Sequence, residues 1–169
     1  MSSSQKSGLV LAVFPTSRGF GWILFEGPMA PVNWGIASVK NNHSAWCMMR
    51  FGKLLDLYQP KAILFEVNVA TEKAKSGRVA VLGQDMRGFA ASRDIEIHLY
   101  SRAEIAAALL SDENASRRAV VELVADLLPI LRDRLPSPRK PWQSEDGRRC
   151  LFDAAALGIA HYRLTRPKP

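Results

Sequence analysis

The sequence predicts a single α/β domain in which helices flank a mixed five-stranded sheet. Three observations support this: residues 8–39 hold three apolar runs separated by turn clusters, later apolar segments alternate between helical and strand spacing, and the 169 residues are 47% hydrophobic. A chain of this length and composition can bury one core. Three strands followed by alternating helices and strands imply three antiparallel strands and then parallel ones.

The first part of the chain predicts the antiparallel unit. Residues 8–13 (GLVLAV) are a continuous apolar run, typical of a strand buried on both faces. A turn cluster at 14–21 (FPTSRGFG) separates it from a second apolar strand at 22–25, so the two form a hairpin. A further Gly/Pro turn leads to a third strand at 33–39 (NWGIASV).

The rest of the chain predicts alternating elements. Apolar residues recur at helical spacing over 44–58, with Ser44 as the expected N-cap and Pro60 just beyond the helix. We expect the other segments to be a buried strand at 61–69, a basic loop and helix at 71–92, a strand at 95–100, helices at 102–110, 114–131 and 144–163, and a proline-rich basic loop at 132–141. Residues 8–163 would then form the domain, with a disordered tail at 1–7 and a second tail at 164–169.

The charge favours a polyanionic partner. The formal net charge is +7 at pH 7, which suits nucleic acid or an anionic membrane surface. No apolar run reaches the ~18–20 residues of a membrane span, and the N-terminus lacks the layout of a signal peptide. Cys47 and Cys150 have no zinc-site spacing. We therefore expect a reduced, cytoplasmic protein without a membrane partner.

Three segments together resemble the RuvC-type Holliday-junction resolvases of the RNase H-like superfamily. Residues 9–22 (LVLAVFPTSRGFGW) are similar to that family's opening hairpin, in which a hydrophobic strand ends in Asp-Pro-Gly. Residues 62–69 (AILFEVNV) and 82–89 (LGQDMRGF) resemble its strand ending in a catalytic Glu and its Leu-Gly-Gln helix. Residues 152–163 (FDAAALGIAHYR) resemble its closing Asp-Ala helix. The resemblance covers nearly the whole chain in order and implies an RNase H-like fold.

The resemblance also implies a nuclease site in which carboxylates from distant segments hold two Mg²⁺ ions. It implies that Glu66 and Asp153 are catalytic and metal-binding residues. Asp146 is a third catalytic candidate, since it lies seven residues before Asp153 and shares its helix face if the last helix reaches that far. Glu145 and Glu26 are further candidates.

Two positions depart from the family pattern. Phe14 stands where the family has its first-strand Asp. This is the position of a lost carboxylate, because an aromatic ring cannot bind Mg²⁺. Cys150 stands where the family often has another Asp, and a soft thiol is a poor Mg²⁺ ligand. The expected carboxylate set is therefore incomplete, and cleavage activity is uncertain.

Basic residues surround the segments that carry these acids. If they share a face with Glu66 and Asp153, they form a phosphate-binding groove, which suits recognition of DNA shape rather than sequence. The nucleic-acid-binding candidates are Lys73, Lys75, Arg78, Arg87, Arg117, Arg118, Arg139, Lys140 and Arg148.

Three functions stay open. We slightly favour a degenerate or weakly active relative of the resolvases that binds branched or duplex DNA, because the ring of Phe14 would fill the pocket left by the metal. The second is an active Mg²⁺-dependent, structure-selective endonuclease on branched DNA. The third is a non-catalytic dimeric scaffold, because the resemblance implies a homodimer, with residues 46–58 or 79–90 as possible contacts.

Overall fold

The computed structural model describes residues 8–38, 43–67, 77–136 and 148–165 and contains the expected mixed sheet. Its strand order is β3-β2-β1-β4-β5. The first three strands are antiparallel, β4 pairs parallel with β1, and β5 pairs parallel with β4. This confirms the predicted fold class. The strands are β1 Val10–Thr16, β2 Gly19–Gly27, β3 Ala30–Ser38, β4 Ala62–Val67 and β5 Glu96–Ser101.

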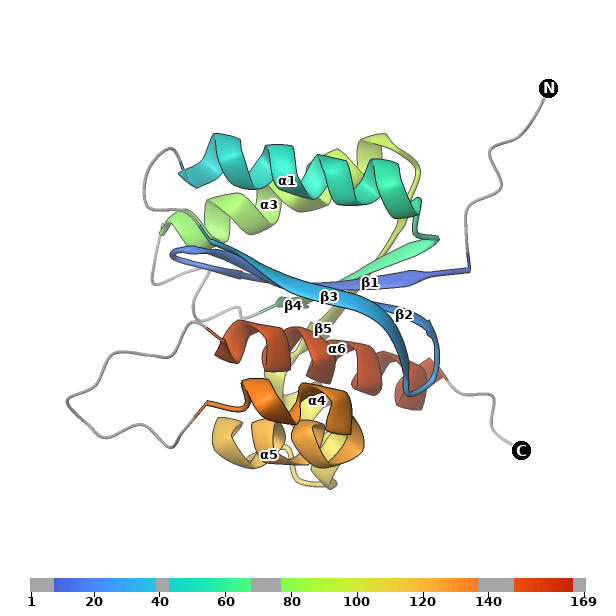
Figure 1. The fold of residues 1–169 in the computed structure, drawn as a ribbon, viewed down its shortest axis with the longest axis vertical. Coiled ribbons are helices and arrows are strands. Elements are labelled where there is room, and N and C mark those ends of the chain that lie inside the picture. Colours follow the sequence, from blue (N-terminus) through green and yellow to red (C-terminus); the bar gives the residue numbers. More distant parts are fainter. Residues whose placement is uncertain (1–7, 39–42, 68–76, 137–147, 166–169) are drawn as a thin grey trace.

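Helices cover both faces of the sheet, as Figure 1 shows. α1 and α3 lie on one face, whereas α6 lies on the other, with α4 and α5 packed outside it. The helices are α1 His43–Tyr58, α3 Arg78–Ser92, α4 Arg102–Leu110, α5 Arg117–Leu127, the 3-10 helix η1 Pro129–Arg134, and α6 Arg149–Thr165. None of the helices in these ranges is long and apolar enough to cross a bilayer.

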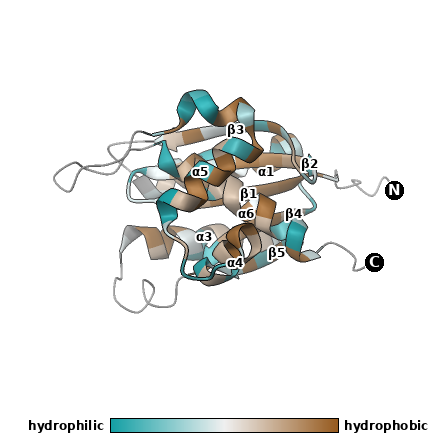
Figure 2. Ribbon diagram, turned by 90° about the horizontal axis from the view of Figure 1, so that it is seen from below, coloured by the Kyte–Doolittle hydropathy of each residue, from teal (hydrophilic) through white to brown (hydrophobic). Residues whose placement is uncertain are grey.

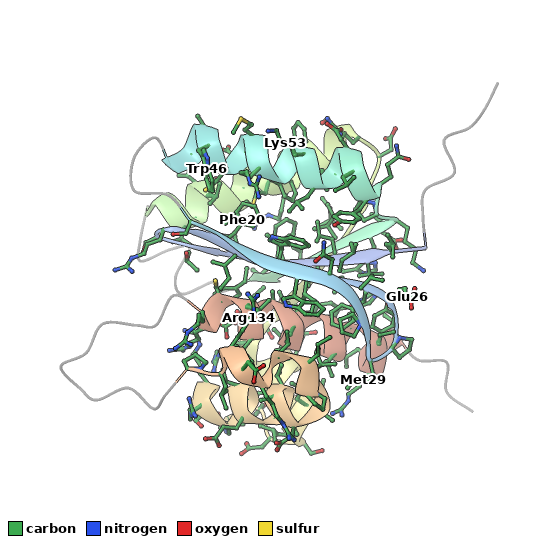
Figure 3. All side chains as sticks on the ribbon, viewed as in Figure 1. Phe20, Glu26, Met29, Trp46, Lys53 and Arg134 are labelled. Atoms are coloured by element: carbon green, nitrogen blue, oxygen red, sulfur yellow. The ribbon has the colours of Figure 1, made fainter. Side chains whose placement is uncertain are left out.

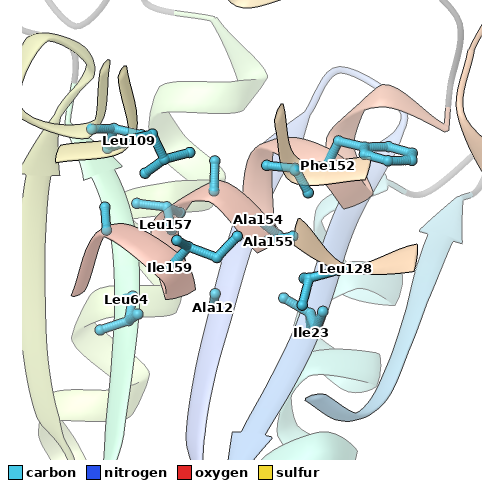
Figure 4. Close-up of a cluster of buried hydrophobic side chains, with 14 of the residues drawn as sticks. Ala12, Ile23, Leu64, Leu109, Leu128, Phe152, Ala154, Ala155, Leu157 and Ile159 are labelled. Carbon is cyan, nitrogen blue, oxygen red and sulfur yellow. The ribbon is translucent and has the colours of Figure 1, made fainter. Parts of the chain in front are cut away.

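Side chains of the central strands alternate between two cores, because successive residues of a strand point to opposite faces. Leu11 and Val13 face the core beneath α1 and α3. Val10, Ala12 and Leu64 face the core beneath α6. Figure 4 shows this second cluster, in which the alanines and large apolar side chains of α6 meet those of the sheet and of the outer helices.

α6 is the central helix of the fold. Every residue from Cys150 to His161 is buried, since the helix is enclosed between the sheet and the pair α4–α5. A helix buried on all sides is apolar on all sides, and Figure 2 shows apolar segments gathered at the centre of the molecule. Its approach to the sheet is close: a Cβ added at Gly21 would lie 2.5 Å from the carbonyl of Cys150. A side chain at that position would therefore displace the start of α6.

Several expected boundaries are wrong. Ser44 lies inside α1, which begins at His43, so it is not the N-cap. The helix expected over 114–131 ends at Leu127, because Pro129 has no N–H for the helical ladder and instead begins η1, which includes part of the expected basic loop. The last helix begins at Arg149 within the described residues and continues to Thr165, and residues 144–147 of the expected helix lie outside the described ranges.

Candidate functional site

The candidate site lies where the parallel strands end on the α6 side of the sheet. Ala12 of β1 pairs with Leu64 of β4, and Phe14 and Glu66 each lie two residues further along. Side chains two residues apart share a face of a strand, so both face the layer that contains α6. Glu66 pairs in turn with Tyr100 of β5. Parallel strands thus bring Phe14 and Glu66 to one edge, although they are far apart in the sequence.

Asp153 comes to this edge from the first turns of α6. It is 8% exposed, in the stretch of α6 from Cys150 to Ala160, which is otherwise buried and apolar. Its Oδ2 accepts a hydrogen bond from Nη2 of Arg117 at 2.9 Å, and Nε of Arg149 lies 4.0 Å from the same oxygen. Burying a carboxylate is costly unless cations accompany it. The two guanidinium groups therefore explain how the charge is held there.

Glu66 and Asp153 are close enough to interact electrostatically. Burial raises the pKa of the Glu66 carboxyl above its ordinary value, and the negative charge of Asp153 raises it further. The positive charges of Arg117, Arg102 and Arg149 act in the opposite direction on the same pKa. Two acids and three arginines thus form one coupled cluster.

Phe14 contributes an aromatic wall to this cluster. It is half-buried and packs against the core beneath α6. The Cζ atom of Arg117 lies 5.7 Å from the centre of its ring, within the range of a cation–π contact. One guanidinium group therefore contacts both the buried carboxylate of Asp153 and the ring of Phe14.

The described residues of this cluster do not fit a magnesium centre. Mg²⁺ requires near-octahedral oxygen ligation, usually from one or two carboxylates together with water and phosphate oxygens, so the test is whether the carboxylates of the cluster are already paired with cations. Within the described ranges, no group of three or more His, Cys, Asp or Glu side chains could hold a metal ion. The Arg117 guanidinium, 2.9 Å from Asp153, adds positive charge where a divalent cation would bind. The charge of this carboxylate is thus matched by arginine.

The other predicted site residues are distributed differently. Arg118 points away from the cluster and bonds to Glu122 and to the carbonyl of Pro136. Arg87 lies in α3, on the opposite face of the sheet, and Arg148 is exposed just before α6. The Arg78 side chain and residues Lys73, Lys75, Arg139, Lys140, Asp146 and Glu145 lie outside the described part of the structure.

The alternative acid Glu26 lies far from the cluster. It is an exposed residue near the end of β2. Figure 3 shows it near Met29 at the β2–β3 turn, toward the end of the sheet where α6 ends. It therefore does not complete the expected set of carboxylates.

Sequence reasoning missed the role of Arg102. It directly follows Ser101, which pairs with Val67 at the end of β4. The carboxyl ends of parallel strands meet at one edge of a sheet, where open α/β folds bind ligands. Arg102 follows β5, and Glu66 lies near the end of the neighbouring strand β4. These two positions could therefore have indicated from the sequence that Arg102 lies near Glu66.

A second polar cluster lies further along α6. The hydroxyl of Tyr100 and Nδ1 of His161 are 2.7 Å apart, and the rings of His98 and His161 are 4.8 Å apart. Burial lowers the pKa of His161 to about 4, helped by the nearby His98. His161 is therefore neutral at pH 7.

Comparison with known proteins identifies the fold. No family model and no curated protein matches the chain. The structure of Thermus thermophilus RuvC aligns with a TM-score of 0.68 at 16% identity, covering 94% of this chain and 95% of that one. The same protein in complex with a Holliday junction substrate gives 0.63 at 17% identity, covering 94% of each chain. The yeast mitochondrial Holliday junction resolvase gives 0.59 at 14% identity, covering 91% of this chain and 78% of that one. The sheet order, the flanking helices and these alignments together show that the chain has the RuvC-like form of the RNase H fold.

Proposed function

We propose that this protein binds nucleic acid through its RuvC-like fold without cutting it. The observation that carries the proposal is the contact of Arg117 with Asp153 at 2.9 Å, made by the same guanidinium that packs over Phe14. Phe14 stands where the resemblance puts a metal-binding carboxylate, and the Arg117 guanidinium contacts both its ring and Asp153. Asp153 is paired with Arg117, and the positive charges of three arginines act on Glu66, so we do not expect metal-assisted cleavage.

Charge supports nucleic acid as the partner. The formal net charge of +7 favours polyanions. T. thermophilus RuvC, which has the same fold, has been solved with a Holliday junction substrate. We therefore propose DNA, branched or duplex, as the ligand, recognised through its phosphates.

Binding and cleavage assays test the proposal together. A fluorescently labelled four-way junction and a duplex with the same arm sequence are titrated with protein, and anisotropy is recorded in EDTA and in Mg²⁺. We expect binding in EDTA, with an affinity that falls as salt rises by a log–log slope of about 0.9 for each phosphate contact. We expect intact DNA after incubation with Mg²⁺ or Mn²⁺. Absence of binding at low salt contradicts the proposal.

The competing candidate is an active, metal-dependent endonuclease on branched DNA. The convergence of Glu66 and Asp153 on one site favours it. Its signature is cleavage of the four-way junction with Mg²⁺ or Mn²⁺ that disappears in Glu66→Gln. That result would replace the non-cleaving function with the enzymatic one.

A further inference from the structure

Three helices begin at the candidate site, and each begins with an arginine. Arg102 opens α4, Arg117 opens α5 and Arg149 opens α6. All three act electrostatically on Glu66, and Arg102 also feels the positive charges of Arg117 and Arg149. The N-terminal ends of helices carry partial positive charge. The fold therefore directs three guanidinium groups toward one place, beside the starts of three helices, of which α4 is already capped by Ser101 and Glu104.

The described residues of this cluster bring three guanidinium groups to two carboxylates. Arg102, Arg117 and Arg149 all act electrostatically on Glu66, and Arg117 also bonds to Asp153. Guanidinium groups gathered in this way are suited to an anion.

Arg102 is the arginine of this cluster whose donors are least satisfied among the described residues. Burial lowers the pKa of its guanidinium, and the positive charge of Arg117 lowers it further. Its Nη2 atom is buried, and no acceptor among the described residues lies within hydrogen-bonding distance of it. A buried donor without an acceptor is unfavourable, so an incoming anion next to this group would relieve both the repulsion and the missing hydrogen bond.

We propose that Arg102, Arg117 and Arg149 form a metal-independent binding site for one phosphate group of a nucleic acid. Guanidinium groups present paired N–H donors that match phosphate oxygens, and helix N-termini favour phosphate. The phosphate is either an internal phosphodiester or a terminal phosphate. This inference rests on the proposed function, which it makes specific to one site.

The first test compares two variants that each remove one positive charge. Arg102→Gln alters the cluster, whereas Arg93→Gln is the control, because Arg93 pairs with Asp56 and packs on Phe89 on the opposite face of the sheet. We expect Arg102→Gln to weaken DNA binding by at least about tenfold, as for loss of a charge-assisted hydrogen bond, and Arg93→Gln to weaken it much less. Arg149→Gln serves as a second cluster variant, and circular dichroism verifies that each variant is folded.

The second test measures phosphate directly. Inorganic phosphate is titrated into the ¹⁵N-labelled protein while the arginine Nε–Hε signals are recorded, with chloride at equal ionic strength as the control. We expect phosphate to shift the Nε–Hε signals of the cluster arginines in a saturable way, and we expect this shift to be lost in Arg102→Gln. Oligonucleotides with and without a 5′-phosphate then separate the two sources: tighter binding of the phosphorylated strand indicates a terminal phosphate, and equal binding an internal one.

The two proposals fail in different ways. Suppose that the protein binds DNA, but that Arg102→Gln binds it as well as Arg93→Gln does and that phosphate shifts no arginine signal. The phosphate site is then refuted and the proposed function stands. If phosphate shifts the Arg102 signal but no DNA binds at low salt, the anion site stands and the proposed function is refuted.

Discussion

Removing either partner of the Arg117–Asp153 ion pair should destabilise the protein, but by different amounts. The Asp153 side chain is 7% exposed, whereas that of Arg117 is 35% exposed. Arg117→Gln leaves a carboxylate that water hardly reaches. Asp153→Asn leaves a guanidinium that water still solvates. We therefore expect the arginine substitution to cost more free energy of unfolding.

The magnitudes follow from the surroundings of each group. Removing one partner of a fully buried ion pair costs about 3–5 kcal/mol. Because Arg149 Nε lies 4.0 Å from the same Asp153 oxygen, part of the compensation remains, and we expect about 2–3 kcal/mol for Arg117→Gln. We expect about 1 kcal/mol for Asp153→Asn, since solvent screening reduces the cost for the exposed guanidinium.

Urea unfolding at pH 7 and low salt measures the difference. Midpoints and slopes are compared for the wild type, both single variants and the double variant, whose coupling free energy isolates the pair. Arg118→Gln is the comparison at the next residue in the chain: it removes an exposed pair with Glu122 and a hydrogen bond to the carbonyl of Pro136. The i,i+4 pair contributes about 0.3–0.5 kcal/mol and the hydrogen bond about 1 kcal/mol, so we expect this variant to cost less than Arg117→Gln. The reasoning is refuted if either Asp153→Asn or Arg118→Gln costs as much as Arg117→Gln.

Three further predictions concern the buried groups along α6 and its neighbours. Glu66→Gln should raise the free energy of unfolding at pH 7. Because the folded pKa of Glu66 is raised, the wild type loses stability as the pH rises above 4.5, and glutamine avoids this loss. Urea midpoints measured below and above pH 4.5 should show the gain only above it. His161 has a folded pKa of about 4, whereas its ordinary value is 6.5. The free energy of unfolding is therefore unaffected by this group above pH 6.5 and falls by about 3 kcal/mol as the pH falls to 4. His161→Gln should flatten this pH dependence, and an unchanged dependence would contradict the burial argument. Gly158→Ala should cost at least about 1–3 kcal/mol by thermal unfolding, because its Cβ would lie 2.1 Å from the ring of Phe25, whereas Gly88→Ala, with no atom within 4 Å, should be neutral or stabilising.

Much of the fold could be predicted from local patterns. The continuous apolar run of β1 and the helical spacing of α1 are properties of sequence neighbours, so the element order and the mixed sheet were predictable. The boundaries of the helices were less predictable. The apolar spacing of α5 continues past Pro129, but the helix ends before it because proline has no N–H to donate. Periodicity records which face is apolar but does not determine where a helix stops.

The candidate site was predictable only in part. Glu66 and Asp153 stood out as acids in apolar surroundings, whereas the expectation that Phe14 replaces a carboxylate rests on the resemblance alone. Arg117 and Arg118 diverge, because one residue along a helix rotates the side chain by about 100°. Which of the two faces the acids was not predictable: Arg117 bonds to Asp153, whereas Arg118 bonds to Glu122.

The sequence by itself determined the strands, the helices, the excess of positive charge and the presence of two acids in apolar segments. Only the tertiary structure decided that Arg102, Arg117 and Arg149, from the starts of three separate helices, meet those acids at one edge of the sheet. The physical reason is that apolar periodicity arises between residues a few positions apart, whereas the energy of a buried charge depends on distances in space that exist only after β1, β4, β5 and α6 have packed together.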